Sequence, residues 1–199
     1  WKIIGGVLAV AVPSVLIFLS IVMQEGQTLI KDYQRNRIMA FFDPATYADT
    51  EAYQQLNSVI AIGSGQLWGK GLNNTDIASV KNGNFLPESQ TDFIFAIIGE
   101  ELGFIGSAVV ILLLILIAMR CVSIARVAKD TAGMVIAAGM GSLIGIQGFM
   151  NIAVATMMMP NTGLPLPFVS YGLSSLVSMY IGIGFVLNVG LQRKNLYNF

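Results

Sequence analysis

Long apolar stretches alternate with polar segments along the chain and determine its predicted architecture. A helix needs about 20 mostly apolar residues to cross a bilayer. Four stretches meet this requirement, at residues 3–23, 93–119, 131–157 and 170–191. The first has too long an apolar core for a signal peptide, and no small-residue cleavage site follows it. The pattern therefore predicts an all-α integral membrane protein with four transmembrane helices.

The short loops predict the orientation of these helices, because loops rich in Lys and Arg stay on the cytoplasmic side. Residues 120–130 carry three basic side chains against one acidic side chain, and the tail carries Arg193 and Lys194. Both segments are therefore expected in the cytoplasm. Four spans then place both ends of the chain inside and residues 24–92 outside.

The predicted external segment, residues 24–92, is long for a connection, and loops of this length are usually functional. Its pattern predicts two short helices, from Asp32 to Phe42 and from Tyr53 to Ile62, the second lying on or dipping into the membrane. The glycines of residues 63–71 (GSGQLWGKG) then predict a flexible turn. No internal repeat or low-complexity linker divides the sequence, so we predict a single domain over residues 1–199.

The composition agrees with a membrane protein and excludes several functions. Hydrophobic residues make up 55% of the chain and charged residues 11%, whereas a soluble domain is about 25% charged. The 11 basic and 11 acidic residues balance, which argues against nucleic-acid binding. The sequence contains no His, which excludes imidazole catalysis, and its single Cys121 forms no internal disulfide. Because the chain begins at Trp1 within an apolar run, we expect it to be part of a longer protein.

The glycine-rich turn invites comparison with phosphate-binding loops, but its spacing fits neither known pattern. Ser64 stands where a P-loop needs its first Gly, and Gly71 stands where it needs Ser or Thr. The dinucleotide-binding pattern also fails, because Gly69 comes one position late and no strand is predicted before it. Two interpretations remain: a tight re-entrant turn, or a pyrophosphate cradle built from backbone N–H groups and Lys70.

Asp92 lies at the predicted external mouth of the second span and has two interpretations. Ser89 and Asp92 have the spacing of a helix-capping box, which would make the carboxylate structural. Alternatively, Asp92 is a general base that faces the outer leaflet. On a helix, Glu88 and Asp92 would share a face, and two neighbouring carboxylates push each other's pKa values apart.

Other polar residues lie inside the predicted spans, where ionisable groups are costly and are usually functional or paired. Glu100 and Glu101 would lie roughly 12–14 Å along the helix from the span mouth, with only one of them facing a cavity. Gln147 and Asn151 are spaced to share a face of the third span, which favours helix packing. The turn at 160–175 holds three prolines, which predict a stiff plug or a wall of the cavity that the span mouth faces.

Three stretches carry a resemblance to a known family: YQQLNSVIAIGSGQLWGKG, FLPESQTDFIFAIIGEELGFIG and PNTGLPLPFVSYGLSSLVSMYIGIGFVLNV. In order and spacing they resemble the SEDS family, which includes RodA, FtsW and the sporulation protein SpoVE. The resemblance implies a ten-span fold in which this chain supplies spans seven to ten and a large structured extracellular loop. Gln66 and Leu173 replace Gly residues that are common among relatives, which suggests a divergent branch.

The resemblance implies a peptidoglycan glycosyltransferase of the bacterial cytoplasmic membrane, with its active site facing outside. Such an enzyme polymerises lipid II, an undecaprenyl-pyrophosphate-linked disaccharide-peptide, with inversion at the sugar C1. The family's essential aspartate matches Asp92 through the TDFIFA motif. The carboxylate would accept the proton of the attacking hydroxyl, orient the acceptor, or hold a divalent cation, Mg²⁺ or Mn²⁺, on the pyrophosphate.

The same motifs imply the remaining site residues and the partners. The residues expected to line a substrate cavity are Gln54, Ser58, Lys70, Glu88, Thr91, Ser170 and Tyr171. Lipid II and the growing glycan strand would be the substrates, and a class B penicillin-binding protein the protein partner. Because further cavity residues would lie in the other half of such a protein, this chain alone is expected to be inactive.

Two functions of other classes remain as alternatives. A flippase for lipid-linked precursors would line its path with polar intramembrane groups such as Glu100 and Gln147, but a transporter places these groups near the midplane, not at one mouth. A scaffold that positions a penicillin-binding protein would need no chemistry of its own, and Asp92 would then be dispensable.

Overall fold

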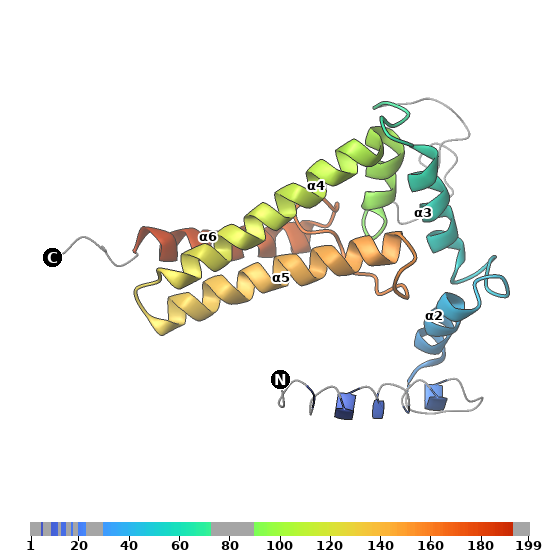
Figure 1. Cartoon of the computed structure of the whole chain (residues 1–199), viewed down its shortest axis with the longest axis horizontal. Coiled ribbons are helices and arrows are strands. Elements are labelled where there is room, and N and C mark those ends of the chain that lie inside the picture. The colour runs from blue at the N-terminus through green and yellow to red at the C-terminus, as the bar shows by residue number, and fades with distance from the viewer. Residues whose placement is uncertain are drawn as a thin grey trace. The chain divides into compact units, whose positions relative to one another are not determined.

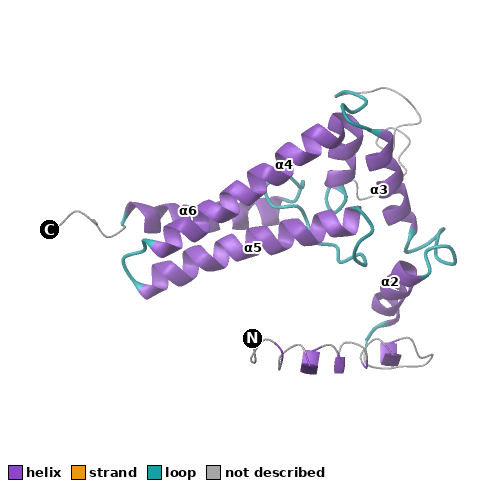
Figure 2. Cartoon of the chain, in the orientation of Figure 1, coloured by secondary structure: helices purple, strands orange, loops and turns teal. Residues whose placement is uncertain are grey.

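The computed structural model of the chain describes residues 30–72 and 90–192, together with isolated helical positions between residues 5 and 22. Its elements are α2 (Asp32–Phe42), α3 (Tyr53–Ser64), α4 (Ile94–Arg126), α5 (Thr131–Ala155) and α6 (Leu173–Leu191). Every described element is a helix, and these ranges contain no strand (Figures 1 and 2). Most of the first predicted span lies outside the described residues. The backbone forms two compact units, Trp1–Tyr53 and Gln54–Phe199, and the single domain stays a prediction.

The first unit contains α2, which forms over the residues that the sequence predicts. Asp32 lies in its first turn, where a negative charge is favourable beside the positive end of the helix dipole. The Lys31 N–H donates to Gln34 Oε1 at 3.3 Å. After the helix, Thr46 Oγ1 donates to the Asp43 carboxylate at 2.6 Å. The first predicted short helix is therefore confirmed, with polar contacts at both of its ends.

In the second unit, α4, α5 and α6 are long and apolar enough to cross a membrane. They correspond to the second, third and fourth predicted spans, which are confirmed as candidate membrane helices. Apolar side chains form the core in which these helices meet, among them Leu114, Cys121, Ile144, Met179 and Val186. At most 28% of the residues in the apolar windows are buried. The remaining apolar side chains face outward, as expected for helices in contact with lipid.

α4 is not one straight helix, a feature that the predicted second span did not include. Gly103 has φ 66° and ψ −164°, outside the helical region, so α4 consists of two helical segments, residues 94–102 and 104–126. In Figure 1 the first segment stands beside α3, and the second runs along α5. Glu100 and Glu101 therefore lie on the short first segment and not within a straight span.

The turn after α3 supplies hydrogen-bond partners for the helix ends that this break creates. Two N–H groups of the turn donate to the last carbonyls of the first segment, and the first N–H groups of the second segment donate to carbonyls of the turn. The four bonds are Lys70 N to Glu100 O at 2.9 Å, Gly71 N to Glu101 O at 3.0 Å, Phe104 N to Gln66 O at 2.8 Å and Ile105 N to Leu67 O at 3.2 Å. Because unpaired backbone groups are costly beside lipid, this exchange makes the break stable.

Glycines allow the two backbones to approach this closely. A Cβ atom on Gly69 would collide with the Glu101 carbonyl, and one on Gly103 would collide with the Gly69 amide. A Cβ atom on Gly65 would likewise collide with the Gly99 carbonyl. Close backbone contact thus accounts for Gly65, Gly69 and Gly103, in agreement with the tight-turn interpretation.

α3, which confirms the second predicted short helix, is fixed by polar side chains that bind the end of α5. Gln55 Nε2 donates to the carbonyls of Val154 and Met159 at 3.0 and 2.9 Å. Ser58 Oγ donates to the Ala155 carbonyl at 2.8 Å. The last carbonyls of a helix have no partner within it, so these side chains satisfy groups that α5 leaves open.

Replacing Gly103 with Ala is expected to destabilise the full-length protein. Its backbone conformation is accessible almost only to Gly, and such strain costs about 1–3 kcal/mol in addition to the collision with Gly69. The matched control is Gly139→Ala, because Gly139 is helical in α5 and an added Cβ would meet nothing within 4 Å. Thermal unfolding in detergent should occur at a lower temperature for Gly103→Ala but not for Gly139→Ala. Equal melting of the two variants would contradict the described break.

Candidate functional site

The segment immediately before α4 is held by hydrogen bonds to three consecutive backbone carbonyls. The bonds are Tyr171 N to Gln90 O at 2.8 Å, Ser170 Oγ to Thr91 O at 2.6 Å and Asn151 Nδ2 to Asp92 O at 2.7 Å. Their donors come from α5 and from the loop before α6, far away in the sequence. Asp92 is thereby placed, half-buried, at the start of the helix that begins at Ile94.

The loop between α5 and α6 lies against this segment as a wall. Two amide side chains of α5 hold it, with Gln147 Nε2 donating to Pro165 O at 2.9 Å and Asn151 Nδ2 donating to Leu164 O at 2.7 Å. The loop continues to Gly172, so α6 begins at Leu173 and not at residue 170 as predicted. The two amides of the third span therefore fix a loop, in addition to the helix packing that their spacing predicts.

The structure brings four of the predicted site residues together: Asp92, Thr91, Ser170 and Tyr171. Ser170 is buried, whereas the side chain of Tyr171 is 76% exposed. The N-cap of α4 is Phe93, so Asp92 immediately precedes the helix. Ser89, the other member of the predicted capping box, lies outside the described residues. Glu88, the predicted neighbour of Asp92, lies outside the described residues.

Two predicted site residues, Gln54 and Ser58, lie on α3. Ser58 is fully buried, and its hydroxyl holds α3 against the end of α5. Gln54 is half-buried. The adjacent Gln55, which was not predicted as a site residue, is 1% exposed and makes two hydrogen bonds to α5 and the residues after it. Its spacing of three from Ser58 on a largely apolar helix was an available signal that the two side chains share a buried face.

Lys70 lies at the opposite end of the short helical segment from Asp92, roughly 12 Å away along the helix. Its Nζ forms an ion pair with Glu100 Oε1 at 2.8 Å, and the side chains of Lys70 and Glu100 are 25% and 1% exposed. Of the two interpretations of the intramembrane carboxylates, pairing is therefore the one that the structure shows for Glu100. A contact between Lys70 and the substrate stays a prediction.

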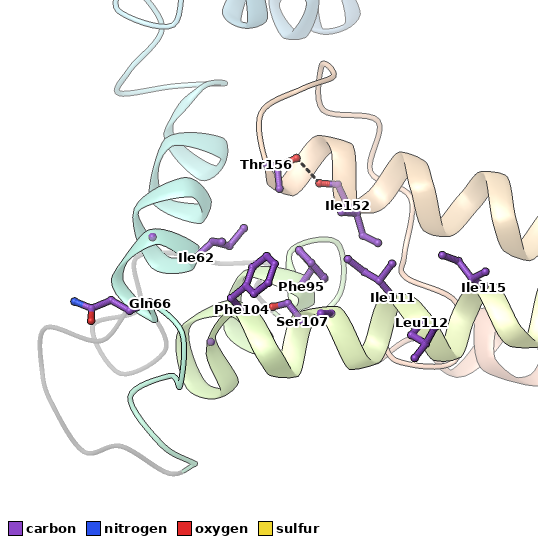
Figure 3. Close-up of a pocket in the computed structure, with 13 residues that line it drawn as sticks. Ile62, Gln66, Phe95, Phe104, Ser107, Ile111, Leu112, Ile115, Ile152 and Thr156 are labelled. Carbon is purple, nitrogen blue, oxygen red and sulfur yellow. Dashed lines mark hydrogen bonds between the residues drawn. The ribbon is translucent and has the colours of Figure 1, made fainter.

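A cavity of about 610 Å³ lies between α3, the two segments of α4 and the end of α5 (Figure 3). Its lining side chains are apolar except for Gln66, Ser107 and Thr156. Thr156 Oγ1 is already engaged, because it donates to the Ile152 carbonyl at 2.8 Å (Figure 3). None of the predicted site residues that the structure describes lines this cavity. Its apolar lining is suited to an apolar group.

No three acidic or cysteine side chains of the described ranges lie close enough together to hold a metal ion. Mg²⁺ is usually held by one or two carboxylates together with waters and substrate phosphates, so a cation at Asp92 would not require such a cluster. The Mg²⁺ or Mn²⁺ ion stays a prediction.

Comparisons with known proteins agree over nearly the whole chain. A family described as "Cell cycle protein" (FtsW, RodA, SpoVE) matches residues 1–195. Peptidoglycan glycosyltransferase MrdB of Escherichia coli K12 is 40% identical over 196 residues, covering 98% of this chain and 50% of MrdB. The probable peptidoglycan glycosyltransferase FtsW of Geobacter metallireducens is 39% identical over 163 residues, covering 82% of this chain and 42% of FtsW. The chain thus spans about half the length of these relatives.

A solved structure shares the fold. It is described as "Structural coordination of polymerization and crosslinking by a peptidoglycan synthase complex". Its sequence identity to this chain is 27% and the TM-score is 0.66, over 98% of this chain and 50% of that one. The helix arrangement described above is therefore also found in a member of a peptidoglycan synthase complex.

Lys70→Met is expected to destabilise the full-length protein, because it removes the cation that pairs with the buried Glu100 carboxylate at 2.8 Å. Breaking such a pair costs about 3 kcal/mol, whereas replacing both charges by apolar side chains is often nearly neutral. The double variant Lys70→Met/Glu100→Leu should therefore unfold at a higher temperature than Lys70→Met alone. Lys129→Met, at an exposed lysine of the loop between α4 and α5, is the control and should unfold like the wild type. A double variant less stable than Lys70→Met would contradict the role assigned to this pair.

Proposed function

The chain belongs to the family of cell cycle proteins that includes FtsW, RodA and SpoVE, and from this premise we propose that it is the part of a peptidoglycan glycosyltransferase that carries the catalytic carboxylate, Asp92. The complete enzyme polymerises lipid II into glycan strands at the outer face of the bacterial cytoplasmic membrane. Relatives named as peptidoglycan glycosyltransferases at about 40% identity support this activity.

The observation that carries the proposal is the fixed position of Asp92 beside Thr91, Ser170 and Tyr171. Three hydrogen bonds hold its backbone segment against α5 and the loop before α6. A catalytic group that is already held in place loses little conformational entropy when it acts on a substrate. Such positioning can remove a large part of the activation free energy. These contacts leave the carboxylate on a rigid support at the end of a membrane helix.

Asp92 acts as the general base in this proposal. Its carboxylate accepts the proton of a sugar hydroxyl as that oxygen bonds to C1 of the donor lipid II. The bond between C1 and the pyrophosphate oxygen breaks, and undecaprenyl pyrophosphate leaves with the bonding electrons. Attack from the face opposite to the leaving group inverts the configuration at C1. The reaction transfers one proton to Asp92 and needs no oxidant or reductant.

The charges of the chain support an outward-facing site. Arg120 and Arg126 lie in the last turns of α4, and Lys129 follows before α5 begins. Because basic loops stay in the cytoplasm, this end of the helices faces inward. Asp92 is at the other end of α4, together with the last residues of α5, and therefore faces outward, where the lipid II head group is presented to the polymerase.

The contacts of the polar intramembrane residues support a polymerase over a flippase. Glu100 is paired with Lys70, and Gln147 donates to the Pro165 carbonyl. These side chains hold helices and loops together, whereas a transporter needs polar groups that line a path near the midplane. For the protein partner we propose a class B penicillin-binding protein, since the solved structure of similar fold is described as a complex that coordinates polymerisation with crosslinking.

Asp92→Asn is expected to abolish glycan synthesis by the full-length protein purified with its penicillin-binding partner. Loss of a general base lowers the rate by about 10²–10⁴-fold, so the glycan ladders formed from fluorescent lipid II should disappear from gels. Asp130→Asn is the matched control. Asp130 is the N-cap of α5, and its Oδ1 accepts a hydrogen bond from Gly133 N at 2.7 Å. It lies at the opposite end of α5 from the residues that contact the Asp92 segment. This control should retain its ladders.

Ladders of wild-type intensity from folded Asp92→Asn would contradict the general-base role. The absence of ladders from the wild type, in an assay where a control polymerase works, would instead favour transport or scaffolding.

A further inference from the structure

We propose that Asn151 is a positioning residue for Asp92, an inference that rests on the function proposed above. Asn151 lies on α5 and is 1% exposed. Its amide contacts the Asp92 backbone directly, and through this contact it determines where the carboxylate points. Asn151 therefore contributes to the reaction by orienting Asp92, in addition to packing the third span.

The Asn151 amide joins two segments that are distant in the sequence. Its Nδ2 donates to the Asp92 carbonyl at 2.7 Å and to the Leu164 carbonyl at 2.7 Å. The two N–H bonds of a carboxamide are fixed in one plane, so both acceptors are held in one relative geometry. The hydrogen bond to the Asp92 carbonyl restrains the peptide between Asp92 and Phe93, and so limits the directions in which the carboxylate can point.

The loop before α6 does not need Asn151 to stay on α5. Gln147, one turn earlier, donates to the Pro165 carbonyl at 2.9 Å and holds the same loop. Of the two amides, Asn151 is the one with a hydrogen bond to the Asp92 segment in the described structure. This difference makes Gln147 a matched control for Asn151.

The burial of Asn151 also argues for a role beyond packing. Its Oδ1 is buried and has no hydrogen-bond partner within the described residues. An unpaired carbonyl oxygen inside a membrane helix is unfavourable, and Leu would fill a similar volume without it. Asn151 provides two hydrogen bonds from Nδ2, which Leu could not form.

Ser170 supports the same geometry from the neighbouring peptide. Its Oγ donates to the Thr91 carbonyl at 2.6 Å and accepts from Leu166 N at 2.6 Å. Without Asn151, the Thr91 carbonyl would remain held while the Asp92 peptide could turn. The expected defect is therefore a misaligned base with the substrate site intact.

The test measures kcat and KM for fluorescent lipid II with the full-length complex. Asn151→Leu should lower kcat at least about tenfold and leave KM within about twofold, because misplacing a catalytic group costs up to about 10²-fold in rate. Gln147→Leu should retain kcat within about threefold of the wild type. Thermal melting of each variant identifies losses caused by unfolding. If Asn151→Leu does not fold, the smaller Asn151→Ala, which also removes the amide donor and adds no charge, should show the same fall in kcat.

An unchanged kcat, or a raised KM at unchanged kcat, in folded Asn151 variants would overturn the proposal. An equal fall in kcat for Gln147→Leu would also overturn it, since loss of the loop would then be the cause. If the wild type is active and Asp92→Asn inactive, these outcomes reject only the role of Asn151. If the wild type makes no glycan, the proposed function fails and the role of Asn151 falls with it.

Discussion

The need to satisfy backbone hydrogen bonds beside a membrane is the constraint on which the second unit depends. A helix that breaks next to lipid exposes N–H and C=O groups that water does not reach. The break at Gly103 is stable because the turn at residues 66–71 provides two donors and two acceptors for it. The same contacts fix the turn on α4, where Lys70 and Glu100 form their ion pair at 2.8 Å. Gly65, Gly69 and Gly103 allow this close approach.

The position of Asp92 follows from the same constraint at the other end of the short segment. Three consecutive carbonyls before α4 receive donors from α5 and from the loop before α6. The segment at residues 94–102 is therefore held at both of its ends, by the turn at Gly103 and by Asn151 and Ser170. In the proposed mechanism, a carboxylate on such a support is positioned for proton transfer before the substrate arrives. This arrangement links the broken helix to the proposed polymerisation of lipid II.

The features that could be predicted from the sequence depend on local information. Apolar length predicts the long helices, periodicity predicts the helix at residues 32–42, and a short motif singles out Asp92. The break at Gly103 could not be predicted, because a Gly within an apolar run is compatible with a helix and the cause is contact with the distant Gly69. The role of Asn151 was also hidden, since its partners are backbone carbonyls, which leave no mark on the pattern of side chains.

The most direct test of this account is an experimental structure of the full-length complex with a non-reactive lipid II analogue in both the donor and the acceptor position. The account predicts that the Asp92 carboxylate lies within about 3 Å of the acceptor hydroxyl, on the face of the donor C1 opposite to the pyrophosphate. Sugars bound away from Asp92, with its carboxylate turned toward protein groups alone, would contradict it.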